Sequence, residues 1–297
     1  ANKNFRGIPK MQKPELLRIK SYLDAIVGER NPFSSPDQLK RCGDYIADQF
    51  RRFQLTVSSE PVPFEAGSSD NILGYQMGTE SDLDPFVLAA HYDTVEGSPG
   101  ADDNASAVAT LLEIAYCLQP VSLKTPLVFA AFTLEEYGFV GSHHHILEAK
   151  KNNKGFNGMI SLEMVGYRDS KPGSQSYPVY VNATEYPDTG DFIAVVGNEP
   201  STELTHQVTE GMRNSEPSLP VEQLIVPGSG IDFTEVRLSD HSPFWEHDIP
   251  AVMITDTAFF RNPNYHQATD TVETLDLELI RDTTEAVAGF LERHLTD

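Results

Sequence analysis

The sequence is short of several residue types, and each shortage excludes a class of protein. It has two cysteines, Cys42 and Cys117, which is too few for a disulfide-rich scaffold, and their spacing does not fit a zinc–thiolate site. Both fall on the apolar faces of predicted helices, so we expect small core residues, with a disulfide between them as the open alternative. No apolar run approaches the roughly 20 residues of a membrane-spanning helix.

Basic residues are also scarce, with 22 Lys and Arg against 44 Asp and Glu, so that the formal net charge is −22. Such a surface repels phosphate backbones, which argues against nucleic acid as a partner. A well-solvated acidic surface explains the charge, and bound metal ions would offset part of it. The sequence starts at Ala1 without Met or a signal peptide. This favours a processed, exported (periplasmic or secreted) enzyme over a cytoplasmic one, although it also fits a trimmed chain.

The length predicts a single domain over residues 1–297, with a helical segment at about residues 1–54. Within that segment, the residues from Ser35 to Gln38 read as a capping box with Pro36 at the first helical position. Apolar residues then follow at helical spacing from Leu39 to Phe53. Two strand-like stretches come next, at residues 55–64 and 71–76.

The centre of the chain alternates short apolar runs with helical patterns. The runs are continuous, as is typical of strands buried on both faces, and they cover residues 86–90, 127–132, 159–162, 192–196 and 251–254. Helices are expected between them, including 104–118, and a last helix at 276–294. This alternation predicts an α/β fold, a three-layer α/β/α sandwich with a mostly parallel central sheet. The segment 167–186, rich in Gly, Pro, Ser and Asp, is expected to leave the core and form a rim of the active site.

Metal-type ligands follow three of these runs. His91 and Asp93 follow the first run, Glu135 and Glu136 the second, and Glu163 the third. Ligands in open α/β sheets bind beyond the carboxyl ends of the strands, so these side chains are expected at one edge. Two more segments bring Asp103 and His266 to the same edge. Hydrolytic zinc takes His nitrogen and carboxylate oxygen, and two ions need five or six ligands if one carboxylate bridges them. The sequence supplies five such ligands, which are enough for two ions: His91, Asp103, Glu136, Glu163 and His266.

Each of these residues also has an ordinary explanation when it is taken alone. His91 could be a loop histidine, Asp102 or Asp103 could cap the following helix, and Glu135 and Glu136 could be a solvated pair. Adjacent acids directly after an apolar strand are nevertheless costly without cations. A ligating His also usually donates its other N–H to a carboxylate, which Asp93 supplies.

At these residues the sequence resembles peptidase family M28, the class of bacterial leucyl aminopeptidases. The resemblance runs from about Ser35 to the C-terminus and implies the zinc-exopeptidase (phosphorylase/hydrolase-like) fold. It is carried by motifs in a fixed order: His91-x-Asp93, Pro99-Gly100-Ala101-Asp102-Asp103-Asn104-Ala105-Ser106, Leu134-Glu135-Glu136-x-Gly138, Ser161-Leu162-Glu163-Met164-x-Gly166-Tyr167, Ser239-Asp240-His241 and Tyr265-His266-x-x-x-Asp270-Thr271.

The resemblance implies a role for each site residue. Asp103 would bridge two zinc ions, with Glu136 and His266 completing one site and His91 and Glu163 the other. Glu135 would be the general base, and Asp93 would orient His91. The resemblance also implies a cis peptide bond between Asp103 and Asn104. The best-known bacterial aminopeptidases have Asp at the position of Glu163, so the ion there is expected to be weaker or replaceable by another divalent metal.

These roles predict a metallo-exopeptidase, an aminopeptidase that hydrolyses the N-terminal residue of peptides with a free N-terminus through a di-metal-activated water. One alternative is a glutaminyl-peptide cyclotransferase of the same fold. Such cyclases resemble one another in having tryptophans around the substrate pocket, whereas the single tryptophan here is Trp245. Another alternative is a non-catalytic peptidase-like binding domain, which would have lost ligands or the base.

Two histidine-containing segments lie outside this assignment. His143, His144 and His145 are consecutive, and consecutive residues of a helix point in different directions. We therefore expect a surface or partly buried histidine run rather than a metal site. Asp240 and His241 adjoin a predicted helix start, where helix capping and support of the active site both stay open.

Overall fold

The computed structural model describes residues 9–297. The start of the chain at Ala1, on which the expectation of export rests, lies outside the described residues, as do the first eight residues of the helical segment 1–54. That segment contains helices α1 (Leu16–Ile26) and α2 (Pro36–Arg52). Among the described residues, no helix combines the length and apolar character needed to cross a bilayer.

One sheet of eight strands forms the centre of the molecule, in the order β1-β2-β4-β3-β5-β8-β6-β7. Strands β4, β3, β5 and β8 are parallel neighbours, β2 and β6 pair antiparallel to the two ends of this block, and β1 and β7 are the edges. The prediction of a mostly parallel sheet is therefore confirmed. The bounds are β1 (Thr56–Phe64), β2 (Gly67–Gln76), β3 (Phe86–His91), β4 (Leu127–Phe132), β5 (Gly158–Glu163), β6 (Ile193–Asn198), β7 (Val221–Val226) and β8 (Ala251–Thr255).

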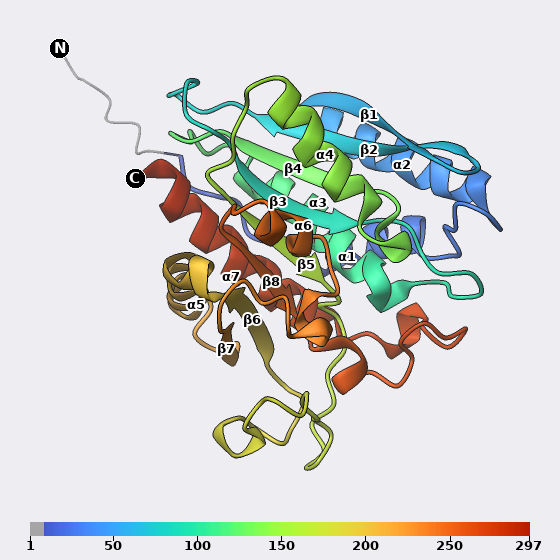
Figure 1. Ribbon diagram of the computed structural model, residues 1–297, viewed down its shortest axis with the longest axis vertical. Helices are drawn as coiled ribbons and strands as arrows, with labels where there is room; N and C mark the ends of the chain where they lie inside the picture. Colours follow the sequence, from blue (N-terminus) through green and yellow to red (C-terminus); the bar gives the residue numbers. More distant parts are fainter. Residues whose placement is uncertain (1–8) are drawn as a thin grey trace.

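Helices cover both faces of the sheet, as the three-layer prediction requires (Figure 1). Along β3, Phe86 and Leu88 pack into one core, and Val87 and Ala89 pack into the other. The first core holds side chains from α1, α2, α3 (Ala107–Leu118), α5 (Thr202–Ser215) and α7 (Leu277–Thr296), and the second holds side chains from α4 (Val140–Lys151) and α6 (His241–Glu246). Each fully buried Leu or Phe stabilises such a core by roughly 1.5–3 kcal/mol.

Three local predictions need correction. Helix α2 begins at Pro36, but the Ser35 hydroxyl accepts a hydrogen bond from the Asn31 amide (2.7 Å) instead of capping α2, so the capping box is wrong. Helix α3 begins at Ala107 rather than residue 104, because the backbone at Asn104 (φ −135°, ψ 28°) is not helical. Strand β7 was not predicted at all, because polar Glu222 and its neighbour interrupt the apolar run of this half-buried edge.

The two cysteines and the irregular segment agree with expectation. Cys42 and Cys117 are buried and free, which confirms core residues and excludes the disulfide. The segment between β5 and β6 leaves the sheet and projects from the body of the molecule (Figure 1). An isolated antiparallel β-bridge between Asp169 and Gly190 joins the two ends of this segment.

Candidate active site

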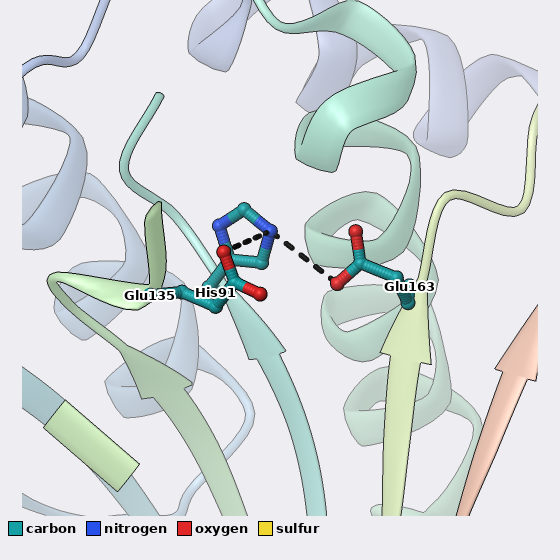
Figure 2. A group of neighbouring side chains, drawn as sticks. All are labelled: His91, Glu135 and Glu163. Carbon is teal, nitrogen blue, oxygen red and sulfur yellow. Dashed lines mark ion pairs between the residues drawn. The ribbon is translucent and has the colours of Figure 1, made fainter. Parts of the chain in front are cut away.

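The carboxyl ends of three neighbouring parallel strands bring the predicted ligands together. His91 is the last residue of β3, Glu163 is the last of β5, and Glu135 begins a short 3-10 turn, η2 (Glu135–Tyr137), after β4. Figure 2 shows His91 between the two glutamates. The His91 Nε2 atom lies 3.4 Å from Glu163 Oε2 and 3.6 Å from Glu135 Oε2. The topology of the sheet therefore creates this cluster, as predicted from the order of the runs.

The Asp103 carboxylate lies between two histidines and presents a different oxygen to each. Its Oδ1 is 3.3 Å from His91 Nε2, and its Oδ2 is 3.0 Å from His266 Nε2. The Glu136 Oε2 atom is 3.1 Å from the same nitrogen of His266. All five predicted ligands thus meet in one cluster, with Asp103 at its centre.

The donor set and its spacing fit zinc. Two donors at 2.0–2.1 Å from a tetrahedral ion lie roughly 3.3 Å apart, close to the separations of 3.0–3.4 Å among the five side chains. Four donor atoms, His91 Nε2, His266 Nε2, Asp103 Oδ1 and Glu136 Oε1, are buried and have no hydrogen-bond partner within residues 9–297. Such atoms lose their hydration without compensation, and a cation would supply the missing partner.

The electrostatics of the cluster lead to the same conclusion. Burial raises the pKa of Glu135 well above its usual range, and burial together with the charge of Asp103 raises the pKa of Glu136 to about 8. Burial lowers the pKa of His266, but the adjacent carboxylates of Asp103 and Glu136 outweigh it and raise the pKa to about 10. These shifts arise because several buried carboxylates surround two imidazoles, an arrangement that divalent cations relieve.

Asp93 contacts both His91 and the turn that carries the glutamates. The His91 Nδ1 atom lies 3.2 Å from the Asp93 carbonyl oxygen and 3.4 Å from its Oδ1. The two carboxylate oxygens accept hydrogen bonds from the backbone amides of Glu135 (3.1 Å) and Glu136 (3.2 Å). This arrangement lets Asp93 set the ring orientation of His91 and hold η2 at the same time.

Asp103 is held by polar contacts that no local pattern in the sequence indicates. Asp270 accepts hydrogen bonds from the backbone amides of Asp102 (2.8 Å) and Asp103 (3.1 Å). The Asn104 amide group donates to the Leu162 carbonyl (3.0 Å) and accepts from the Met164 amide (2.9 Å), on either side of Glu163. The peptide bond between Asp103 and Asn104 is cis, as the resemblance implied.

Two further side chains form hydrogen bonds that hold Glu163 and the loop that follows β3 in place. The Ser239 hydroxyl donates to Glu163 Oε2 (2.6 Å), which fixes one oxygen of the longer carboxylate. Arg30 is fully buried, and in the described part of the chain its side chain donates to five backbone carbonyls, those of Ile26, Gly28, Tyr92, Pro99 and Gly100. Ser239 belongs to one of the family motifs, although the sequence assigned it no role as a ligand. Nothing near Arg30 in the sequence indicates its distant partners.

Asp240 and His241 are both buried next to this edge of the sheet. Asp240 makes no capping bond to α6 and instead accepts a hydrogen bond from the Ser142 hydroxyl (2.6 Å), so the capping alternative is wrong. Burial raises its pKa to about 7. The His241 ring lies 2.7 Å from the Val236 carbonyl oxygen through Nε2 and packs edge-on against Trp245.

The histidine run on α4 is not a metal site among the described residues. His143 is exposed, and His144 and His145 are half-buried. The Nδ1 atom of His145 lies 3.1 Å from Glu60 Oε2. The groups of described side chains that could hold a metal include none of the three, so the interpretation as a surface or partly buried run is confirmed.

An apolar pocket adjoins the cluster, and both Glu163 and Tyr265 line it. Tyr177 and Tyr186 of the projecting segment contribute to its wall, which confirms this segment as a rim of the site. Trp245 does not line the pocket, because it is buried beneath the sheet and donates through Nε1 to the Ala251 carbonyl (2.8 Å). The other apolar lining residues include Pro178, Val181, Phe192, Ala194, Val196, Leu224, Val236, Leu238, Met253, Phe259 and Phe260.

The sequence model of peptidase family M28 matches residues 71–291. Escherichia coli YfbL, an uncharacterised protein, is 38% identical over 95% of this chain and 89% of its own length. Aminopeptidase YwaD of Bacillus subtilis is 28% identical over 76% of this chain, but the match spans only 45% of that relative.

Solved structures share the fold. The Legionella pneumophila LapA aminopeptidase superposes with a TM-score of 0.75 at 20% identity, over 100% of this chain and 76% of that one. A glutaminyl cyclase of Bacteroides thetaiotaomicron superposes with a TM-score of 0.71 at 17% identity, over 96% and 99% of the two chains. At these identities the similarity identifies the architecture and leaves the reaction to be argued from the site.

Proposed function

The chain belongs to peptidase family M28, and from this premise we propose that it is an aminopeptidase that hydrolyses the N-terminal residue of peptides. The observation that carries the proposal is the position of Asp103, whose two carboxylate oxygens face two different histidines. A carboxylate in that position suits a bridge between two ions, and paired ions are a recurrent device of aminopeptidases.

We assign Asp103 as the bridge, His91 and Glu163 as the other ligands of one ion, and His266 and Glu136 as those of the second. Imidazole nitrogen and carboxylate oxygen are the donors that zinc takes in hydrolytic sites. When bound, zinc lowers the pKa of a coordinated water towards about 7 and polarises the carbonyl under attack.

Glu135 is the general base in this proposal. It lies at the same cluster as the ligands, 3.6 Å from His91 Nε2, and it has no assigned ion. Burial raises its pKa, which makes it a better proton acceptor near neutral pH. Glu135 would take a proton from the attacking water and pass it to the leaving amine. Asp93, through the amides of η2, would keep Glu135 in position.

Recognition of the substrate would use the carboxylate cluster and the apolar pocket, which meet at Glu163. The positive α-amino group of a free N-terminus would enter the carboxylate cluster, where the opposite charge favours it. The adjacent apolar pocket would receive the side chain of the first residue. A cluster of negative charge directly beside an apolar pocket suits the first residue of a peptide better than an internal one.

The glutaminyl-peptide cyclotransferase alternative has one observation in its favour, the shared fold with a bacterial cyclase. Against it, the aromatic side chains that line the pocket beside Glu163 are tyrosines and phenylalanines, and Trp245 lies elsewhere. Measuring ammonia release from a peptide with N-terminal Gln separates the two reactions, since the aminopeptidase releases free glutamine instead. A non-catalytic binding domain is disfavoured because the five ligands and Glu135 are all present and converge.

The decisive experiment measures metal content and hydrolysis of an amino-acid amide panel together, with and without a chelator. We expect chelation to abolish hydrolysis and added Zn²⁺ to restore it. Glu135→Gln should lose turnover while both metals stay bound, and Glu136→Ala should lose metal as well. Glu148→Gln on the surface of α4 is a matched control that should change neither. Activity that survives complete removal of metal would overturn the proposal.

A further inference from the structure

An exposed aromatic cluster is formed by residues from the end of β1, the turn after β4 and the loop before α2. The apolar pocket is lined instead from β5, β6, β7 and β8, which form the other half of the sheet, and from the segments beside them. Phe33 and Tyr137 are 44% and 41% exposed, and they lie in contact with each other rather than singly. Their ring centroids are 5.1 Å apart in an edge-on arrangement, and Phe64 at the end of β1 packs edge-on against Phe33 at 5.5 Å. We call these three residues the Phe33 cluster.

The Phe33 cluster is held in place by one buried side chain, Asn31. The Asn31 Oδ1 atom accepts hydrogen bonds from the amides of Phe33 (2.9 Å) and Ser34 (3.0 Å). Its Nδ2 donates to the Tyr137 hydroxyl (2.6 Å) and to the Thr94 carbonyl (2.9 Å). The two exposed rings are therefore pre-organised, and binding to them costs little conformational entropy.

The position of the cluster relates it to the proposed reaction. Tyr137 belongs to the same short turn, η2, as the base Glu135 and the ligand Glu136. The apolar pocket instead adjoins Glu163 at the end of β5. Glu135 follows β4, and strands β4 and β5 flank β3, which carries His91 (Figure 2). If the first side chain of a peptide fills the pocket, the rest of the peptide leaves on the Glu135 side, where the leaving amine takes its proton.

We propose that Phe33 and Tyr137, supported by Phe64, bind the side chain of the second residue of the substrate and favour an aromatic or bulky aliphatic one. The inference rests on the proposed aminopeptidase function and adds a preference on the leaving side of the scissile bond. An aromatic ring of the substrate that packs edge-on against Phe33 and Tyr137 would cover apolar surface that is otherwise in water.

The test compares two tripeptides that differ only at the second residue, Leu-Phe-Gly and Leu-Gly-Gly. We expect the native enzyme to have a kcat/KM about tenfold higher for Leu-Phe-Gly. Phe33→Ala should reduce this ratio to about one through a higher KM for Leu-Phe-Gly, and Phe33→Leu should restore part of it. The exposed Leu17 of α1 gives the matched control, because Leu17→Ala removes a similar apolar side chain (81% exposed) and should keep the ratio.

Equilibrium binding keeps this proposal separate from the proposed function. Binding of the two tripeptides to Glu135→Gln protein, with and without Phe33→Ala, should show the same tenfold preference and its loss. A ratio of one in the native enzyme and in binding, or a preference that survives Phe33→Ala, would overturn the subsite. Absence of cleavage of either tripeptide by metal-loaded native protein would instead contradict the aminopeptidase function, and the binding ratio would still decide the subsite.

Discussion

The metal edge and the pocket wall of this site are built in different ways. At the metal edge, the ligands stand at the ends of β3 and β5 or in turns directly after strands, and buried hydrogen bonds fix them. The pocket wall combines residues of β6, β7 and β8 with irregular segments between β5 and β6, after β7 and after β8. The ligands thus depend on the rigid sheet, whereas the choice of substrate depends partly on irregular segments that tolerate change.

Removal of the bridging carboxylate should have the largest effect. We expect Asp103→Ala to lose both metal ions and to reduce kcat/KM by at least about 1,000-fold for every amino-acid amide, because both ion sites share this residue. Metal analysis by mass spectrometry and the amide panel test this. Retention of one full equivalent of zinc with substantial activity would contradict the bridge.

A change in the pocket wall should instead alter the choice of substrate. Ala194 on β6 lines the pocket, and Ala194→Phe would fill space that a leucine side chain needs. We expect kcat/KM for leucinamide to fall about 100-fold and that for alaninamide to fall much less, with two zinc ions retained. An equal loss for both amides would mean that the pocket does not receive the first side chain.

Metal affinity should weaken as the pH falls. In the metal-free protein the pKa values of Glu136 and His266 are raised to about 8 and about 10, so both carry protons at pH 7. Ion binding must displace these protons, and affinity therefore rises with pH until the groups deprotonate by themselves. Competition with a chelating dye at pH 6, 7 and 8 should show a loss of at least about tenfold per pH unit. A pH-independent affinity would contradict the ligand roles of both residues.

The smallest effect on metal affinity is expected for a residue that contacts a ligand but does not itself bind the metal. Ser239→Ala removes the hydrogen bond to Glu163 Oε2 and should weaken zinc at the His91 and Glu163 site by about tenfold, with the other site unchanged. Stepwise zinc titration followed by calorimetry separates the two sites. Ser59→Ala on the exposed β1–β2 hairpin, which also deletes a hydroxyl–carboxylate bond, is the control and should change neither.

The same contrast explains what the sequence could predict. Continuous apolar runs followed by His91, Glu135 or Glu163 indicate strand ends, and parallel strands bring their ends to one edge, so the ligand cluster followed from the pattern alone. Strand β7 was missed because its edge position allows polar residues. The contacts of Asn104 and Asp270 depend on pairings across 58 or more residues, which no local periodicity reveals.

The buried guanidinium of Arg30 has a consequence for how the site comes into being. Its carbonyl partners at Pro99 and Gly100 lie 69 and 70 residues further along the chain, and Arg30 itself precedes the region matched by the family model. During synthesis on the ribosome, this charge must wait in solvent until the loop leading to Asp103 has emerged. A fragment cut at the boundary of the family match would carry all five ligands. It would lack Arg30, whose hydrogen bonds stabilise the loop between His91 and Asp103.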